Sequence, residues 1–314
     1  MTDSTETNAA IEIKDLCKKI DGRIIVNNVN MRIQPGTMFA LLGPNGAGKT
    51  TTTRLITGML HPSKGEILIN GTPMNDDTGA ELRSIMGIQV DGNAYMNMTV
   101  LENLKLWADI YDVPVKEMDE RIERMIINFT LDEYKDMPVG ELSKGNRQKV
   151  LIARALIPNP RMVFLDEPTS GIDPQSAAGL MNMLHDMCAN HDCTVFMNTH
   201  RLQGLDGIVD SIGVMENGVL VETGKVSDMI HERWPRKEYE LVTEEPYDHR
   251  LIDMLVDWNK DTGFIEIKPD VEPYQVLETL LKHDVHVNEF NCRHRTIQDL
   301  YLDKVKAGDW EVSE

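Results

Sequence analysis

Residues 43–50 limit the fold of this chain more than any other segment, because they read Gly-Pro-Asn-Gly-Ala-Gly-Lys-Thr. A short apolar run of strand length precedes them at residues 38–42, and a helical pattern follows at residues 48–60. Glycines let a backbone turn sharply and point its N–H groups inward. The order of strand, glycine loop and helix therefore predicts a phosphate-binding loop in an α/β fold.

Each part of this loop has a use in binding a nucleotide. Lys49 would reach the β- and γ-phosphates, and the Thr50 hydroxyl would ligate Mg²⁺. The helix that follows favours an anion at its N-terminus. The predicted nucleotide site contains Gly43, Pro44, Asn45, Gly46, Ala47, Gly48, Lys49, Thr50 and Thr51. Such a loop alone does not separate GTPases, kinases and helicases from other nucleotide-binding proteins.

Two acidic residues follow a second apolar run, at residues 162–165. Asp166 at the end of this run would hold Mg²⁺, directly or through water. Glu167 could orient and polarise a water molecule for attack on the γ-phosphate. An acidic turn after a strand is the simpler explanation, but it leaves the sequence of residues 168–173 unexplained.

A third segment, at residues 142–148, reads Leu-Ser-Lys-Gly-Asn-Arg-Gln. Ser143 is a favourable N-cap for a helix predicted at residues 144–156. Taken alone, the segment is as consistent with an ordinary capped helix as with a ligand site. Next to the other two segments, the start of this helix is expected to bind an anion.

These three segments resemble the Walker A, signature and Walker B segments of ABC-type ATPases, in the same order along the chain. The resemblance implies that the nucleotide is ATP and that it is hydrolysed. The signature departs from the usual Leu-Ser-Gly-Gly-Gln, because Lys144 replaces the first Gly and Asn146-Arg147 precede Gln148. By resemblance, Ser143-Lys144-Gly145 of one chain contact the γ-phosphate of an ATP held by a second chain.

The resemblance assigns roles to two more residues. Asp173 matches an Asp that crosses the dimer interface. His200 follows a strand-like run and matches the family's switch histidine, which contacts the γ-phosphate and helps to hold the attacking water. Glu167 and His200 are therefore the predicted catalytic residues.

Two positions depart from the family pattern. The aromatic residue that usually stacks on adenine is replaced by Ile20, which can make apolar contact but has no π face. The Gln that usually touches Mg²⁺ is replaced by Asp91 when the register is counted from Gly87. Gln89 is the alternative, and it requires the loop to be realigned.

The predicted organisation is a P-loop ATPase core of ABC type at residues 1–230, with a helical subdomain at about residues 92–158, and a small α+β domain at residues 235–314. Helices are expected at residues 99–111 and 115–134. By resemblance this subdomain touches a membrane partner, which Met96, Met98, Trp107 and Tyr111 could line, although core packing is the simpler role for each.

An alternating β-α-β-α-β-α pattern is expected in the small domain. Its strands are predicted at residues 238–243, 263–268 and 285–291, and its helices at residues 246–258, 273–283 and 296–305. The last helix resembles that of the C-terminal domain in ATPases of exporters with separate membrane subunits.

Composition restricts the partners. The net charge of −19, from 32 basic and 51 acidic residues, argues against nucleic acid and against direct docking on anionic lipid. No apolar run is long enough to span a membrane, and the N-terminus lacks the pattern of a signal peptide. We therefore expect a cytoplasmic chain, and the resemblance to ABC ATPases implies that it lies peripherally at the cytoplasmic face of the cell membrane.

The sequence thus predicts the ATPase subunit of an ABC transporter, with ATP and Mg²⁺ as cofactors and an exporter as the preferred direction. Its expected partners are a second copy of this chain and membrane-spanning subunits on another chain. An importer ATPase and a soluble ABC protein acting on ribosomes or DNA are the alternatives. A regulator without turnover is disfavoured because Glu167 is present.

Overall fold

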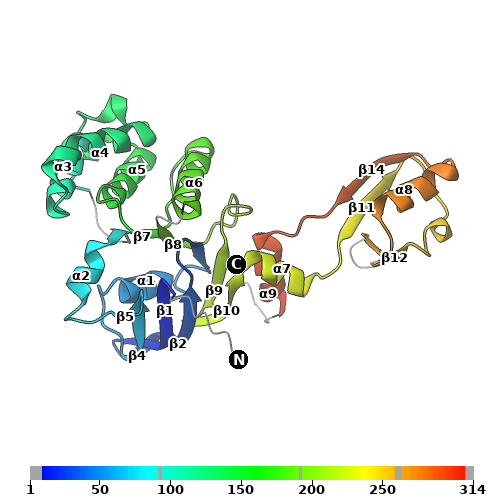
Figure 1. Ribbon diagram of the computed structural model, residues 1–314, viewed down its shortest axis with the longest axis horizontal. Helices are drawn as coiled ribbons and strands as arrows, with labels where there is room; N and C mark the ends of the chain where they lie inside the picture. Colours follow the sequence, from blue (N-terminus) through cyan, green and yellow to red (C-terminus); the bar gives the residue numbers. More distant parts are fainter. Residues whose placement is uncertain (1–8, 91–93, 191–192, 259–263, 308–314) are drawn as a thin grey trace, which may run out of the picture. The chain divides into compact units, whose positions relative to one another are not determined.

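The computed structural model describes residues 9–90, 94–190, 193–258 and 264–307 of the chain. It divides into two compact units, Met1–Val226 and Ser227–Glu314, and each is described by itself (Figure 1). No helix in these described ranges is long and apolar enough to cross a membrane.

A six-stranded sheet with the order β10-β9-β3-β8-β7-β6 is the centre of the first unit. Only β10 is antiparallel to its neighbour, and β3 and β8 are buried along their whole length, as expected for a parallel sheet covered on both faces. Its strands are β3 (Met38–Leu42), β6 (Met86–Gln89), β7 (Met162–Asp166), β8 (Thr194–Thr199), β9 (Ser211–Glu216) and β10 (Val219–Lys225). Because five neighbouring strands, β9, β3, β8, β7 and β6, are parallel, their carboxyl ends meet at one edge of the sheet.

A second, antiparallel sheet has the order β2-β1-β4-β5. Its strands are β1 (Ile11–Ile20), β2 (Arg23–Ile33), β4 (Lys64–Ile69) and β5 (Thr72–Pro73). One apolar core joins this sheet to the parallel sheet and to α1 (Lys49–Ile56), and includes Ile11, Val26, Leu41, Leu55, Phe164 and Phe196. The glycine loop is therefore held between two packed layers.

The helix after the glycine loop is shorter than predicted. The pattern predicted a helix at residues 48–60, whereas α1 ends at Ile56 with Thr57 as its C-cap. Gly58 then has φ +68. Glycine in this left-handed region is the usual way to end a helix, which the apolar pattern did not reveal.

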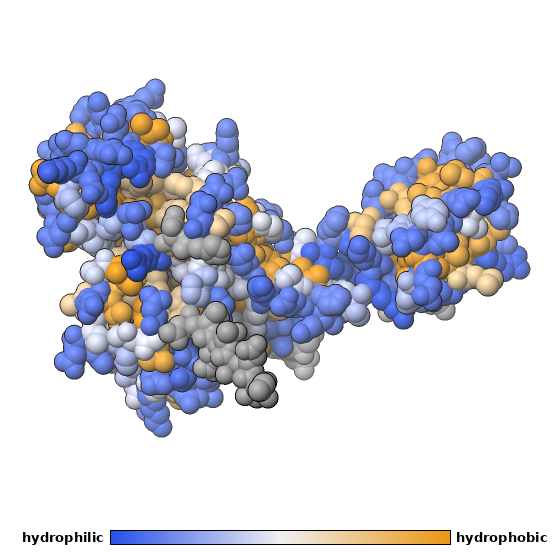
Figure 2. All heavy atoms as spheres, viewed as in Figure 1, coloured by the Kyte–Doolittle hydropathy of each residue, from blue (hydrophilic) through white to orange (hydrophobic). Residues whose placement is uncertain are grey.

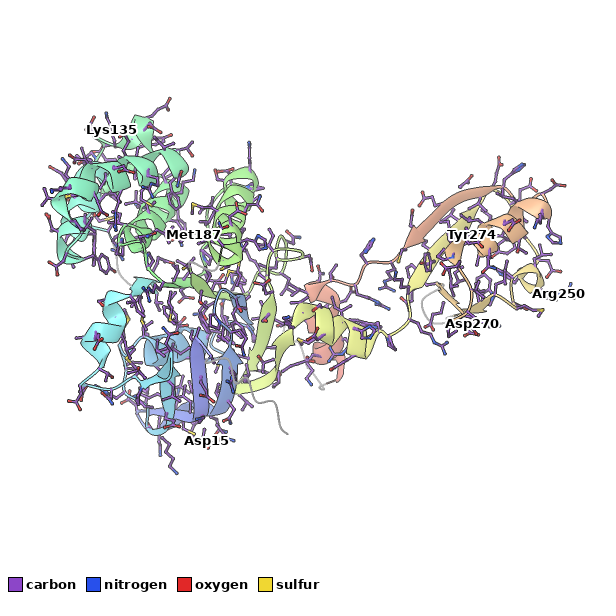
Figure 3. All side chains as sticks on the ribbon, in the orientation of Figure 1. Asp15, Lys135, Met187, Arg250, Asp270 and Tyr274 are labelled. Carbon is purple, nitrogen blue, oxygen red and sulfur yellow. The ribbon has the colours of Figure 1, made fainter. Side chains whose placement is uncertain are left out.

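Three helices gather in one segment of the first unit (Figure 1). They are α3 (Val100–Ile110), α4 (Val115–Asn128) and α5 (Lys144–Leu156). Thr99 starts α3 with a capping box that includes Glu102. The carbonyl of Lys135, labelled in Figure 3, accepts a hydrogen bond from Leu101 N at 2.9 Å and ties the loop after α4 to α3.

The prediction of one helix at residues 115–134 was wrong. The helix ends at Asn128, Thr130 has φ +52, and a separate 3₁₀ turn, η1 (Asp132–Tyr134), follows. A residue in the left-handed region cannot continue an α-helix. The remaining elements of the first unit are α2 (Gly79–Ser84), η2 (Val139–Glu141) and α6 (Pro174–Ala189).

The second unit contains an antiparallel sheet with the order β12-β13-β11-β14. Its strands are β11 (Glu238–Thr243), β12 (Val256–Trp258), β13 (Ile265–Ile267) and β14 (Val287–Cys292). Its helices are α7 (Val226–Arg233), η3 (His249–Leu251), α8 (Pro273–Lys282) and α9 (Ile297–Ala307). Tyr274, which is labelled in Figure 3, belongs to the first turn of α8. Val276 and Leu280 of α8 belong to the same apolar core as Tyr239 and Ile265 of the sheet.

The helix predicted at residues 246–258 is not formed, so the expected strict alternation of strands and helices was wrong. Only the short turn η3 is helical there, and Val256 and Trp258 pair with Ile267 and Ile265 of β13. The pairing places both side chains on the core face of the sheet, so contacts distant in sequence outweigh the local helical pattern.

Candidate nucleotide-binding and catalytic site

The glycine loop runs so close to other backbone segments that side chains are excluded at two positions. A Cβ atom on Gly43 would lie 2.1 Å from Met215 O, and one on Gly48 would lie 2.7 Å from Ile25 O. Both glycines also have positive φ, +152 and +101. The loop can therefore follow this path only with glycine at these positions.

Lys49 lies within the loop that precedes it. Its side chain is buried, and Nζ donates hydrogen bonds to Gly43 O at 2.7 Å and to Pro44 O at 3.0 Å. Burial lowers the pKa of Lys49, while the carboxylates of Glu167 and Asp166 raise it. A buried cation that donates to the carbonyls of the loop fits the role of a phosphate ligand.

The loop borders a pocket of about 380 Å³. The pocket is lined by Ile25, Asn45, Gly46, Gly48, Lys49, Thr50, Thr51, Asp166 and Glu167. It thus joins the backbone donors of the loop, one buried cation and two carboxylates. This donor set fits a triphosphate with a divalent cation.

Thr50 and Asp166 form the group that fits Mg²⁺. Thr50 Oγ1 donates to Asp166 Oδ2 at 2.7 Å, and Asn198 Nδ2 donates to Asp166 Oδ1 at 3.2 Å. Burial raises the pKa of Asp166, and the hydrogen bonds from Thr50 and Asn198 lower it. A hydroxyl and a carboxylate oxygen side by side are hard ligands of the kind that Mg²⁺ prefers.

Gln89 is the last residue of β6, and its side chain is buried. Its Oε1 accepts a hydrogen bond from Asp166 N at 3.2 Å, so the side chain of Gln89 contacts the backbone of the acidic segment. Asp91, the preferred candidate from sequence, lies outside the described residues. The choice between Asp91 and Gln89 for the position beside Mg²⁺ stays a prediction.

Glu167 is held by the end of the neighbouring strand β8. Its Oε1 accepts a hydrogen bond from His200 N at 3.0 Å and lies 2.7 Å from His200 Nδ1. Its Oε2 accepts from Thr199 Oγ1 at 3.2 Å. The carboxylate is 24% exposed, so it is oriented by three contacts and still reaches the pocket.

Sequence reasoning missed the residues that orient this pair of carboxylates. Asn198 lies opposite Asp166 in the register of β7 and β8 and also bonds to Thr53 Oγ1. Thr199 contacts Glu167. The only signal in the sequence was the polar end of an apolar strand, directly before His200.

The signature residues do not line this pocket in the described part of the chain. Ser143 caps α5, with its Oγ accepting from Asn146 N at 3.1 Å, and both Ser143 and Lys144 are exposed. A Cβ atom on Gly145 would lie 2.5 Å from Gly171 O. The signature residues therefore pack against the loop that follows Glu167 and face outward.

Asp173 is also exposed. It caps α6 by accepting a hydrogen bond from Ser176 N at 2.9 Å, and this bond holds the pKa of Asp173 below its usual value. Ile20 ends β1 and pairs with Arg23 across the hairpin. It is not among the residues described as lining the pocket, whereas the apolar side chain of Ile25 in β2 is one of them.

Comparison with known proteins identifies the family of this chain. Residues 26–170 match the ABC transporter family. The bacitracin transport ATP-binding protein BcrA of Bacillus licheniformis is 31% identical over 274 residues, or 85% of this chain and 81% of its own length. The methionine import ATP-binding protein MetN of Geobacillus kaustophilus is 35% identical over 205 residues, or 64% of this chain and 60% of its own length.

A solved structure of an ATP-binding cassette dimer, in a post-hydrolysis state bound to ADP and Pi, has a TM-score of 0.62 and 26% identity. The structural alignment covers 69% of this chain and 98% of the chain in that structure. Such cassettes are ATPases that dimerise and work with membrane subunits. This chain therefore belongs to the ABC transporter family as an ATP-binding, ATP-hydrolysing subunit.

Proposed function

We propose that this chain is the ATPase subunit of an exporter, placed at the cytoplasmic face of the membrane. The direction is supported by the similarity to the Nod factor export ATP-binding protein I of Cupriavidus metallidurans, which is 30% identical over 224 residues, or 71% of this chain. The alignment with the bacitracin transport protein reaches further along this chain. That alignment covers 274 residues and is longer than the first unit, which ends at Val226, so it includes part of the second unit. The alignment with the methionine importer, over 205 residues, is short enough to lie within the first unit.

The site supports a hydrolysis mechanism with defined roles. Lys49 would exchange its loop carbonyls for the β- and γ-phosphate oxygens. Thr50 and Asp166 would hold Mg²⁺, which neutralises charge on the triphosphate when bound. Glu167 would accept a proton from the attacking water, while His200 fixes Oε1 and Thr199 fixes Oε2.

A homodimer supplies the missing half of each site. Ser143 and Lys144 are exposed at the N-terminus of α5, which is 13 residues long, and they do not line the pocket of their own chain in the described residues. An exposed helix N-terminus favours an anion. We place the γ-phosphate of ATP bound to the second chain against Ser143, Lys144 and Gly145, with Asp173 at the same interface.

The accessory domain at residues 235–314 is proposed to tune dimer closure. Among the described residues, none of those that line the nucleotide pocket lies in it. A chain truncated after Arg236 should bind ATP within about threefold of the full chain, because the phosphate contacts remain. A loss of about tenfold or more, in a truncated chain that still folds, would contradict this division of roles.

The direction of transport is tested by reconstitution. The chain is purified with its membrane subunits and placed in vesicles whose ATPase sites face outward. A panel of compounds that includes bacitracin is added on the ATPase side or enclosed in the lumen. An exporter is stimulated by a compound on the ATPase side and accumulates it in the lumen. Stimulation only from the lumen would contradict export and favour an importer.

A further inference from the structure

A second pocket of the first unit lies where the end of α4, the middle of α5 and the side of α6 meet, and it shares no described residue with the nucleotide pocket. Its volume is about 430 Å³, within the range of about 300–1,000 Å³ that is usual for small-molecule sites. Its lining includes Thr130 after α4, Lys149 of α5 and Gly179 of α6. The pocket has room for an organic molecule, and these three residues indicate which kind.

Gly179 is an unfavourable residue for its position in α6. The helix runs from Pro174 to Ala189, so Gly179 lies well inside it, and glycine is among the least favourable residues in a helix interior. Within the described chain, a Cβ atom on Gly179 would meet nothing within 4 Å. Packing in the described chain therefore does not require a glycine here, and its effect is to keep this side of the pocket open.

Thr130 is unfavourable for the opposite reason. It has φ +52, a left-handed conformation that favours glycine and is rare for a β-branched residue. Thr130 N donates to Ile127 O at 3.0 Å and Leu131 N donates to Ile126 O at 2.9 Å, so Thr130 occupies the position at which a glycine usually ends a helix. A glycine where a side chain suits the helix, and a threonine where a glycine suits the backbone, line one pocket. Such departures from local preference are typical of functional sites.

Lys149 gives the same pocket a cation. Its side chain is half-buried, and within the described part of the chain it forms no hydrogen bond and no ion pair. Hydrogen bonds from Ser176 lower the pKa of Asp173 most, and the charge of Lys149 lowers it further. The charge of Lys149 therefore acts toward the start of α6. The apolar part of the lining comes from Phe129, Leu180 and Met183.

We propose that this pocket binds a small organic carboxylate with an apolar body, such as a medium-chain fatty acid or an aromatic acid. Its carboxylate would accept hydrogen bonds from Lys149 and from the hydroxyl of Thr130. Its hydrocarbon part would contact the three apolar residues of the lining. This site is additional to the nucleotide site, and the proposal needs neither a membrane subunit nor a direction of transport.

An amphipathic carboxylate is favoured over other anions. Most of the surface visible in Figure 2 is hydrophilic, and the chain has a net charge of −19. Because such a chain repels anions in general, an anion needs apolar contact as well as a local cation to stay bound. A phosphate is best matched by several donors or a free helix N-terminus, whereas Lys149 is the one cationic side chain in the described lining of this pocket.

The experiment measures binding of octanoate and phenylacetate to the full chain by calorimetry. Saturating ADP and Mg²⁺ are present, so that the nucleotide pocket is filled. At least one acid should bind with a Kd below about 1 mM. The neutral amides octanamide and phenylacetamide have the same apolar bodies, and the amide of that acid should bind about tenfold or more weakly, because hydrogen bonds between charged groups are the stronger ones.

Two pairs of variants locate the bound acid. Gly179→Leu fills the pocket, and Ala178→Leu adds the same side chain at the exposed neighbouring position of α6, outside the described lining. Lys149→Met removes the cation, and Lys116→Met does so at an exposed position of α4. The first variant of each pair should weaken binding about tenfold or more, and the second should leave it unchanged.

The melting temperature separates a ligand site from a structural role. Gly179→Leu and Thr130→Gly both restore the residue that the local backbone prefers, so each should keep or raise the melting temperature while it weakens binding. A fall of several degrees in both variants would show that packing within the chain requires the native residues, and it would overturn the proposal.

The pocket also includes Ile172, the residue before Asp173. A bound carboxylate adds negative charge beside Asp173, so octanoate or phenylacetate, whichever binds, should weaken ATP-driven dimers of the Glu167→Gln chain. This step alone rests on the proposed homodimer. Dimers that a bound acid leaves unchanged would overturn the step, whereas a chain that forms no ATP-driven dimer without any acid would overturn the homodimer itself.

Three results would overturn the binding site. The first is that neither acid binds with a Kd below about 1 mM. The second is that the amides bind as tightly as the acids, which would remove the role of Lys149. The third is that binding survives both Gly179→Leu and Lys149→Met, which would place the acid elsewhere on the chain.

Discussion

Two helix N-termini of this chain are candidates for binding the same triphosphate. They differ in whether a side chain of the chain caps their first N–H groups. α1 begins after Gly48, which has φ +101 and provides no side-chain cap. α5 begins after Ser143, whose Oγ accepts from Asn146 N at 3.1 Å. The first helix therefore leaves its N–H groups free for a ligand, whereas the second has satisfied one of them with its own side chain.

The lysines beside these two helix starts differ in the same sense. Lys49 is buried and bonded to the carbonyls of Gly43 and Pro44, while Lys144 is exposed. A preorganised loop binds a ligand without a large ordering cost. We infer that the α1 end binds the nucleotide within one chain and that the α5 end acts only when a second chain presents its nucleotide.

The largest expected effect belongs to the α1 side of the site. Glu167→Gln keeps the shape of the side chain but removes the base, so turnover should fall by about two orders of magnitude or more. ATP binding should be retained, and the variant should accumulate as an ATP-bound dimer on a sizing column. Thr199→Val, which removes only the hydroxyl that donates to Oε2, is the matched control and should cost less. Near-normal turnover of Glu167→Gln would exclude Glu167 as the base.

The second prediction tests the comparison of the two helix ends directly. Lys49→Ala should weaken ATP binding to the monomer by about tenfold or more, as expected for losing hydrogen bonds from a charged donor. Ser143→Asp keeps an N-cap residue but places a negative charge where the γ-phosphate of the second chain is expected. It should leave binding to the monomer unchanged and prevent ATP-driven dimers, measured in the Glu167→Gln background.

Two results with the Ser143→Asp variant would contradict the role given to the α5 end. Weaker nucleotide binding by the monomeric Ser143→Asp chain would mean that α5 contributes to the site of its own chain. A lower melting temperature would mean that the cap was lost rather than the phosphate contact, and Ser143→Asn, a neutral cap, is the matched control for that outcome.

The sequence predicted elements well where local chemistry decides them. The predicted helix at residues 144–156 has the observed bounds of α5, because Ser143 caps it and its apolar residues share one face. It failed for residues 246–258, where the pairing of Val256 and Trp258 with β13 decides the structure. Contacts between strands distant in sequence leave no local pattern, so single-sequence reasoning does not detect them.

The same distinction applies to the site. The sequence predicted the glycine loop and the two carboxylates because the spacing within each of these two segments is typical of the chemistry. The contacts of Asn198 with Asp166 and of Thr199 with Glu167 arise only from the parallel register of β7 and β8. No spacing in the sequence states which strand lies beside which, so these orienting residues became visible only in the folded chain.

A smaller effect separates Gln89 from Asp91. Gln89→Ala removes the acceptor of Asp166 N, so it should lower the stability of the chain by about 1–3 kcal/mol. Asp91→Asn should instead change turnover and its Mg²⁺ dependence more than ATP affinity, because a carboxylate near Mg²⁺ adds charge there. Thermal unfolding and magnesium titrations of the ATPase rate measure the two effects. A changed Mg²⁺ dependence in Gln89→Ala, with none in Asp91→Asn, would reverse the assignment.

The smallest expected effect concerns the base of the nucleotide, where neither helix end contributes. The sequence favoured Ile20 as the residue under adenine, yet Ile25 lines the pocket and Ile20 is 39% exposed at the end of β1. A base stacked on an aromatic ring gains about 1–3 kcal/mol, so Ile25→Tyr should tighten ATP binding by about 1 kcal/mol, or roughly fivefold. Ile20→Tyr is the matched control and should leave the affinity unchanged. If only Ile20→Tyr binds ATP more tightly, in a chain with an unaltered melting temperature, adenine lies beside Ile20 at the end of β1. The base would then lie outside the pocket that Ile25 lines.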